Sequence, residues 1–352
     1  LAPQVLVAHD WHEALAVCAL RTLQDMGQQR GIGTVQTVHN AAHTGLYGER
    51  ELAATGLPGE LFRPDGLEFH GALSLLKAGL VWADRIVAVS PRYAEEIQTP
   101  AFGEGLDGLY RYRAHRLTGV ANGIDTARYD PASDPALAAP FHARRPKGRA
   151  ACRDALLEER ALEAPATESG LLLGAVGRLA PQKGWAVLAA ALPRLVARGA
   201  SVALVGAGDP AIAAQIEAAS KRFPGRVALS RGWNDALARR VYAGADAILV
   251  PSRFEPCGLV QLLAQRYGAL PVAHAVGGLR DTIDDGESGI LFEPLSADAL
   301  VDAVARAAEL LEKRGRQEVA RALLDIDVSW RKPARRWERI LRAVAREAAA
   351  RL

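Results

Sequence analysis

Cationic side chains follow one predicted strand in the second half of the chain. The apolar run from Leu171 to Gly177 leads directly into Arg178, and Lys183 comes five residues later, just before a predicted helix. Arginine offers a planar, bidentate donor, lysine offers a compact charge, and the start of a helix adds partial positive charge. This combination is suited to binding a diphosphate, whereas taken alone the two cations are also typical of surface charges. A P-loop is excluded, because no Walker-type glycine-lysine pattern is present.

Two more polar loops follow predicted strands in the same half. The stretch from Pro251 to Leu259 contains Glu255, whose carboxylate could accept hydrogen bonds from sugar hydroxyls or serve as a cap or first-turn acid of the next helix. Gly277 and Gly278 would let the backbone approach a ligand closely and direct amides at an anion. Cys257 is more typical of a packed thiol than of a nucleophile, because no neighbour in the sequence supplies a base.

Polar residues also end two predicted strands in the first half. His9, Asp10 and His12 follow one apolar run, and His39 with Asn40 follows the next. A metal site is disfavoured, because Asp10 and His12 have no third ligand at a useful spacing. A serine hydrolase is disfavoured too, because no Gly-X-Ser-X-Gly motif is present. Parallel strands end at one edge of a sheet, so we expect these residues to face a ligand cleft.

The elements that would position these residues alternate between short apolar runs and amphipathic stretches. In the second half the strands are continuous apolar runs, which indicates a doubly wound parallel sheet covered on both faces. The predicted strands there are 171–177, 202–205, 226–229, 247–250 and 271–276, and the predicted helices are 185–198, 211–222, 236–242 and 259–267.

The first half repeats this pattern with fewer elements. Its predicted strands are 5–8, 34–38, 85–89 and 117–121, and its predicted helices are 13–26, 72–81 and 91–97. Residues 129–169 are interpreted as a linker that contains a helix, and Trp330, Trp337 and Ile340 fall on helical spacing in the last segment. Because the chain begins on a core-strand pattern, we expect that an opening segment of this domain is absent.

The composition excludes several classes of protein. The chain has 352 residues, 49% hydrophobic and 24% charged, with a net charge of +3, as in a globular protein that needs no nucleic-acid partner. Its three cysteines form no disulfide or metal pattern, which favours a reducing compartment. There is no membrane-spanning run and no signal peptide, so we expect a cytoplasmic protein without a membrane partner.

Taken in chain order, the polar motifs resemble those of bacterial glycogen synthases and plant starch synthases. The resemblance extends over essentially the whole chain, and its most specific part is the Ser-Arg-Phe-Glu-Pro-Cys-Gly-Leu stretch that begins at Ser252. The motifs are His9-Asp10-Trp11-His12, Val38-His39-Asn40, Ala83-Asp84-Arg85 with Val89-Ser90-Pro91, Asn122-Gly123-Ile124-Asp125, Gly177-Arg178-Leu179 with Gln182-Lys183-Gly184, Pro251 to Leu259, and Gly277 to Thr282.

The resemblance implies an α/β protein with the GT-B fold, in which two Rossmann-like, doubly wound domains face a cleft. The first domain is expected to be truncated at its N-terminus, because the Lys-Thr-Gly-Gly-Leu loop that opens family members is not in the sequence. Residues 1–120 would form the acceptor-side domain, joined by a crossover helix at 329–352. Residues 121–328 would bind the nucleotide-sugar.

The resemblance also implies a reaction. A member of this family transfers glucose from ADP-glucose, or from UDP-glucose, to the non-reducing end of an α-1,4-glucan and retains the anomeric configuration. No metal or other cofactor is expected, so positive side chains would have to stabilise the departing diphosphate. The expected partners are therefore the nucleotide-sugar and the glucan.

The matching motifs carry the family's site residues onto this chain. The residues implied for catalysis are Asp10, His39, Arg178, Lys183 and Glu255. Arg178 and Lys183 match the phosphate-binding pair, and Trp233 falls where an aromatic ring stacks on the base. The further residues implied for donor binding are Asn122, Gly177, Cys257, Gly258, Leu259, Gly277, Gly278 and Leu279.

The chain departs from related patterns at two further positions. Leu263 stands where many related transferases have a second carboxylate, and Val276 stands where a threonine often precedes the two glycines. Two alternatives to a glucan synthase stay open. One is a non-catalytic remnant that binds nucleotide or glucan, and the other is a GT-B transferase for a small acceptor.

Overall fold

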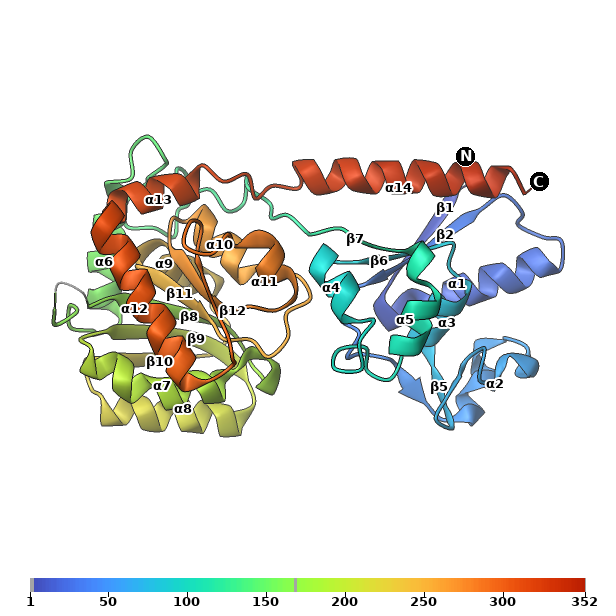
Figure 1. The fold of residues 1–352 in the computed structure, drawn as a ribbon, viewed down its shortest axis with the longest axis horizontal. Helices are drawn as coiled ribbons and strands as arrows, with labels where there is room; N and C mark the ends of the chain where they lie inside the picture. Colours follow the sequence, from blue (N-terminus) through green and yellow to red (C-terminus); the bar gives the residue numbers. More distant parts are fainter. Residues whose placement is uncertain (1–2, 168–169, 352) are drawn as a thin grey trace. The chain divides into compact units, whose positions relative to one another are not determined.

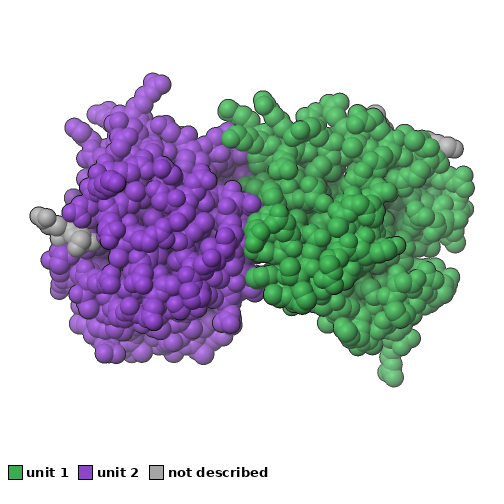
Figure 2. All heavy atoms as spheres, in the orientation of Figure 1, with its two compact units in different colours: residues 1–122, 331–352 green, residues 123–330 purple. Residues whose placement is uncertain are grey.

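The computed structural model describes residues 3–167 and 170–351, and the chain divides into two compact units (Figures 1 and 2). Unit 1 comprises the residues up to Asn122 together with the segment from Arg331, and unit 2 runs from Gly123 to Trp330. Each unit has its own parallel sheet and its own hydrophobic core. The α/β class expected from the sequence is confirmed in both units.

Unit 1 is built on a parallel sheet with the strand order β1-β2-β6-β7 among the described residues. Every residue of the inner strand β2 is buried, including the polar residues Thr34, Gln36 and Thr37. Helix α4 follows β6 because Ser90 caps it, accepting from the Tyr93 amide, with Pro91 at the first helical position. The strands are β1 (Val5–His9), β2 (Gly33–Val38), β6 (Arg85–Ala88) and β7 (Leu117–Gly119), and the helices between them are α1 (Asp10–Asp25), α3 (Leu75–Trp82), α4 (Pro91–Glu96), α5 (Asp107–Tyr112) and η3 (Ala114–Arg116).

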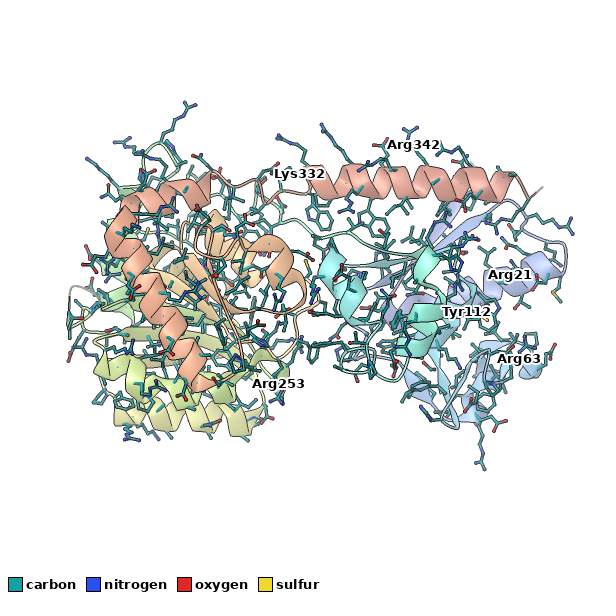
Figure 3. All side chains as sticks on the ribbon, viewed as in Figure 1. Arg21, Arg63, Tyr112, Arg253, Lys332 and Arg342 are labelled. Carbon is teal, nitrogen blue, oxygen red and sulfur yellow. The ribbon has the colours of Figure 1, made fainter. Side chains whose placement is uncertain are left out.

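Helix α14 (Arg331–Ala349) completes unit 1, where it packs on the sheet. Val344 is fully buried and packs with Val35 and Val87 of β2 and β6. A Cβ on Gly33 would lie 2.4 Å from Val344 Cγ1, so only glycine permits this close approach. The opposite, exposed face of the helix carries basic side chains, of which Lys332 and Arg342 are labelled in Figure 3. The helix expected near the end of the chain is therefore present.

A small antiparallel sheet with the order β3-β5-β4 lies between β2 and α3 in the sequence. The helix predicted at 72–81 was wrong over its first three residues, because they form strand β5 (Ala72–Ser74). Ser74 then caps α3 by accepting from the Lys77 amide, which sets the start of the helix. The other elements here are β3 (Leu46–Tyr47), η1 (Glu49–Glu51), α2 (Leu52–Thr55), η2 (Gly59–Leu61) and β4 (Glu68–Phe69).

Unit 2 holds a parallel sheet with the strand order β10-β9-β8-β11-β12-β13 among the described residues. Apolar clusters cover both faces of the sheet, which explains why its strands are apolar at successive positions. The strands are β8 (Leu172–Leu179), β9 (Ser201–Gly208), β10 (Val227–Arg231), β11 (Ala247–Val250), β12 (Leu270–His274) and β13 (Ile290–Phe292). The helices are α6 (Gly148–Glu159), η4 (Pro181–Lys183), α7 (Trp185–Ala197), α8 (Pro210–Arg222), α9 (Asp235–Gly244), α10 (Val260–Arg266), α11 (Gly277–Thr282), α12 (Ala297–Arg314) and α13 (Arg316–Leu324).

The helix expected within residues 129–169 is present as α6, but the prediction of a linker was wrong over the described part, which belongs to the body of unit 2. Helix α6 packs on α9, and its Cys152 and Leu156 are buried in the same apolar cluster as Phe141. The hydrophobic periodicity of this stretch is weak because only one narrow side of α6 is buried, so the sequence did not indicate that the helix packs into unit 2. Residues 168 and 169 of the predicted linker lie outside the described residues.

Candidate active site

A glycine brings two loops together at the carboxyl edge of the sheet in unit 2. Gly184 lies between η4 and α7 with φ +69°, a conformation that disfavours other residues. A Cβ at this position would lie 1.7 Å from the carbonyl oxygen of Pro251, which follows β11. The loop after β8 therefore packs directly against the loop after β11, and the two strands are neighbours in the sheet.

This contact pairs two of the residues selected from the sequence. Lys183 Nζ lies 2.6 Å from Glu255 Oε2, and the hydroxyl of Ser252 donates to the same oxygen at 2.9 Å. The side chain of Lys183 is 20% exposed and that of Glu255 only 8%. With Gly177, these groups line a small cavity of about 20 Å³. A buried carboxylate is thus held in place by one cation and one hydroxyl.

Arg178 is more exposed than Lys183 and lies near the end of strand β8. Strand β8 continues to Leu179, two residues beyond its predicted end, so Arg178 is its next-to-last residue. Its Nη2 donates to Gln182 Oε1 at 3.0 Å, and its carbonyl oxygen accepts from Trp185 Nε1 at 2.7 Å. Gln182 also donates to the carbonyl oxygen of Phe254 at 3.2 Å. Gln182 therefore connects Arg178 with the loop that carries Glu255.

The loop from Cys257 to Leu259 is held by hydrogen bonds to its main chain. Gln261 Nε2 donates to the carbonyl oxygens of Cys257 and Gly258 at 3.0 and 2.8 Å. A Cβ on Gly278 would lie 2.2 Å from the carbonyl oxygen of Cys257, and the Gly278 amide donates to the carbonyl oxygen of Glu255 at 2.9 Å. Gly277 and Leu279, which flank Gly278, are buried in α11. The predicted donor-binding segments on either side of Glu255 and Gly278 are therefore in direct contact.

Two further side chains of unit 2, Trp233 and Arg253, are exposed. Trp233 is 65% exposed and lies between β10 and α9, next to Gly232 with φ +98°. The following residue, Asn234, caps α9 by accepting from the Leu237 amide at 2.9 Å, which fixes the end of this loop. Arg253, labelled in Figure 3, projects from the loop after β11. Its amide donates to the carbonyl oxygen of Gln182 at 2.8 Å.

In unit 1, Asp10 organises the carboxyl edge of the sheet. It is the first residue of α1 and has φ +51°, a conformation that non-glycine residues rarely adopt. Its Oδ1 accepts from the amides of His39 and Asn40 at 2.7 and 3.3 Å, and its carbonyl oxygen accepts from Gln36 Nε2 at 3.0 Å. One carboxylate oxygen of Asp10 is therefore used to hold the loop after β2.

His39 is half-buried and contacts a second imidazole. His39 Nε2 lies 2.9 Å from His9 Nδ1, and one of the two nitrogens donates. Burial lowers the pKa of His39, the carboxylates of Asp10 and Glu13 oppose this shift, and His9 adds to it. Asn122 is also half-buried and follows β7 by three residues, at the same edge of the sheet.

Three residues that hold these groups were assigned no individual role from the sequence: His9, Gln182 and Ser252. Each lies within three residues of a selected residue and at the same strand end, a signal that could have identified it. Among the described residues, no cluster of three or more His, Cys, Asp and Glu side chains has the geometry of a metal site. In the same part of the chain, no helix has both the length and the apolar character needed to cross a membrane.

Comparisons of the sequence with protein families and curated proteins give consistent matches. The profile described as starch synthase catalytic domain matches residues 1–112, and that described as glycosyl transferases group 1 matches residues 170–309. A glycogen synthase of Methylocella silvestris is 44% identical over 359 residues, covering 98% of this chain and 72% of that protein. A glycogen synthase of Thermus thermophilus is 43% identical over 336 residues, covering 95% of this chain and 72% of that protein.

Solved structures give the same result for the fold. The catalytic domain of starch synthase IV from Arabidopsis thaliana, bound to ADP and acarbose, matches with a TM-score of 0.90 and 29% identity. The match covers 97% of this chain and 73% of that one. Sucrose-phosphate synthase from Thermosynechococcus elongatus matches with a TM-score of 0.62 at 22% identity, a likeness in fold alone.

Proposed function

Since the chain belongs to the glycosyltransferase family of bacterial glycogen synthases and plant starch synthases, which has the GT-B fold, we propose that it extends an α-1,4-glucan with glucose from ADP-glucose. The resemblance drawn from its motifs is confirmed by these matches. Transfer to the non-reducing end with retention of configuration is the reaction that the family implies. The ADP bound to the Arabidopsis domain supports an adenine nucleotide as the leaving group.

We assign the donor to the carboxyl edge of unit 2, and the observation that carries this assignment is the contact of Lys183 with Glu255. Both side chains are largely buried and lie where two neighbouring strands end. As the bond to the diphosphate breaks, negative charge develops on the phosphate oxygens, and a cation already fixed in place stabilises it. Lys183 supplies that charge from its buried position, and Arg178 adds a bidentate donor from the strand end.

Glu255 has a different role in this proposal, which is to orient the glucosyl group. Lys183 and Ser252 hold one of its oxygens, so the carboxylate has a fixed direction in which to accept sugar hydroxyls. Trp233 stacks on the base, and the exposure of its ring supports this role. Backbone groups of Gly177, of Cys257 to Leu259 and of Gly277 to Leu279 line the rest of the donor.

We assign the glucosyl and acceptor contacts of unit 1 to His39 and Asn122, at the carboxyl edge of its sheet. Asp10 supports His39 by binding the amides of the loop that carries it. An imidazole whose pKa is lowered stays neutral near pH 7, so His39 can exchange hydrogen bonds with sugar hydroxyls without bringing a charge. No metal ion or other cofactor has a role in this scheme.

The test is a transferase assay with glycogen as acceptor and ADP-glucose or UDP-glucose as donor. The expected result is a longer α-1,4-linked glucan, with ADP-glucose preferred and a chelator without effect. Elongation of glucose or maltose in place of glycogen would favour a transferase for small acceptors. Saturable binding of ADP and of glucan without any release of ADP would favour a non-catalytic remnant.

A further inference from the structure

Two imidazole rings meet at the carboxyl edge of the sheet in unit 1. His9 is the last residue of β1 and pairs in register with Thr37 of β2, and His39 follows Thr37 by two residues. His9 Nδ1 and His39 Nε2 are 2.9 Å apart, and the ring planes are tilted by 32°. This distance is that of a hydrogen bond between the two rings.

The backbone around the two rings is fixed from several directions. The amide of His9 donates to Glu13 Oε2 at 2.8 Å, which ties it to the first turn of α1. The amide of Ala41 donates to the buried hydroxyl of Tyr93 at 2.8 Å, and the amide of His39 donates to Asp10 at 2.7 Å. The main chain on both sides of His39 is therefore held, and the contact that orients its ring is the hydrogen bond with His9.

A hydrogen bond between two imidazole rings requires that the two facing ring nitrogens carry one proton between them. One of the facing nitrogens must carry a hydrogen and the other a lone pair, so the contact closes when the facing atoms share a single proton. If both rings are fully protonated, two N–H groups of like charge face each other and the contact opens. The hydrogen bond therefore fixes the orientation of the rings, and it forms only in some protonation states.

We propose that His9 is a positioning residue for the glucosyl site: its Nδ1 holds the imidazole of His39 in one orientation, and the two rings share one proton. The proposal rests on the role assigned to His39 in the proposed function and deepens it. His9 itself has no contact with the sugar in this scheme. Its effect on transfer comes entirely through the ring of His39.

The charged groups around the pair predict the direction of its pH response. Asp10 and Glu13 raise the pKa of His39, whereas burial and the charge of His9 lower it. Because its pKa is lowered, His39 is neutral near pH 7 and gains its proton only as the pH falls below 6.5, its ordinary value. Removing His9 removes one of the groups that lower this pKa, so protonation of His39 must then occur at a higher pH.

Substitutions at His9 separate its two ring nitrogens. In His9→Asn the side-chain amide takes the place of Nδ1, whereas in His9→Gln it takes the place of Nε2, and neither amide titrates. His115→Asn is the matched control, because His115 is an exposed histidine at the opposite edge of the same sheet, just before β7. The melting temperature of each variant is measured first, to check that all three fold.

The first measurement is an NMR titration of His39 in histidine-labelled protein, which does not depend on activity. We expect its pKa to rise in both His9 variants and to stay unchanged in the control. The second is glucan elongation across pH. We expect His9→Gln to lose roughly 10- to 100-fold in kcat/KM, the usual cost of a displaced supporting contact. We expect His9→Asn to keep most of the rate, with the acid limb of its pH–rate profile moved to higher pH.

Two results would overturn the proposal. An unchanged titration of His39 in both variants would show that the rings do not share a proton. Equal elongation rates for the two His9 variants and the unsubstituted protein would show that the contact positions nothing. Failure of the proposed function is distinct from both, because it would remove elongation from every protein tested while the titration still decides whether the pair exists.

Discussion

The ion pair between Lys183 and Glu255 predicts an asymmetric response to mutation. Lys183→Met leaves the Glu255 carboxylate 8% exposed and held by the hydroxyl of Ser252. Removing one partner of a buried pair costs about 3–5 kcal/mol, and we expect about 3 because Lys183 is itself 20% exposed. For a unit of the size of unit 2, a loss of about 3 kcal/mol corresponds to a fall of about 6–12 °C in melting temperature.

Substituting the other partner of the pair should destabilise unit 2 less. In Glu255→Gln the ammonium group of Lys183 keeps its path to solvent, and the amide still accepts from Ser252, so we expect a loss of about 1 kcal/mol. The double variant should be more stable than Lys183→Met alone, because it leaves no unpaired charge, with a coupling energy of about 2 kcal/mol.

Calorimetry of the four proteins, supported by denaturant unfolding, measures these differences as a double-mutant cycle. The matched control is Arg321→Met, which removes an exposed pair with Glu318 in the same unit and should change stability by less than about 1 kcal/mol. A larger loss for Glu255→Gln than for Lys183→Met would refute the reasoning, as would a coupling energy near zero.

Four other changes have defined outcomes. Arg178→Ala should lower kcat by about 10²- to 10³-fold at saturating ADP-glucose, and near-normal turnover would remove Arg178 from the phosphate site. Trp233→Ala should weaken ADP binding in calorimetry by about 1–3 kcal/mol while Trp233→Tyr restores it, and unchanged affinity would exclude stacking. Burial lowers the pKa of His274, so its unfolded form binds more protons and stability should fall as the pH drops below 6.5. Denaturant unfolding of His274→Asn, which can still donate to Ser252, should show less of this loss, and identical pH curves would contradict the assignment. Gly184→Ala should lower the melting temperature of unit 2 by several degrees, unlike Gly177→Ala, because an added Cβ meets the Pro251 carbonyl only at position 184; equal effects would be inconsistent with that contact.

The sequence predicts unit 2 better than unit 1, for a physical reason. Strands buried on both faces are continuous apolar runs, and the predicted run 247–250 matches β11 residue for residue. The segment 72–81 failed because its residues suit a helix, and only pairing with β3 and β4 makes the first three extended. The helix within 129–169 was expected, but its packing into unit 2 was not, because only one narrow side of α6 is buried.

For the candidate site, residue types could be predicted from the sequence and their pairing could not. Lys183 and Glu255 were each selected because they follow a predicted strand. Their contact could not be predicted, because they lie 72 positions apart in the sequence. Their contact depends on β8 and β11 being neighbours although two strands separate them in the chain. His9 and Ser252 were assigned no individual role because each of them holds another side chain.

The division of unit 1 into two stretches of sequence also has a consequence for its synthesis. Unit 2 is continuous, whereas helix α14, whose Val344 packs on the sheet of unit 1, is translated only after about 200 intervening residues. At roughly 5–20 residues per second this delay is about 10–40 s on the ribosome. During that interval Val35 and Val87 lack their helix, so a nascent chain must keep this apolar surface from aggregating, and unit 2 can be fully folded before unit 1 is complete.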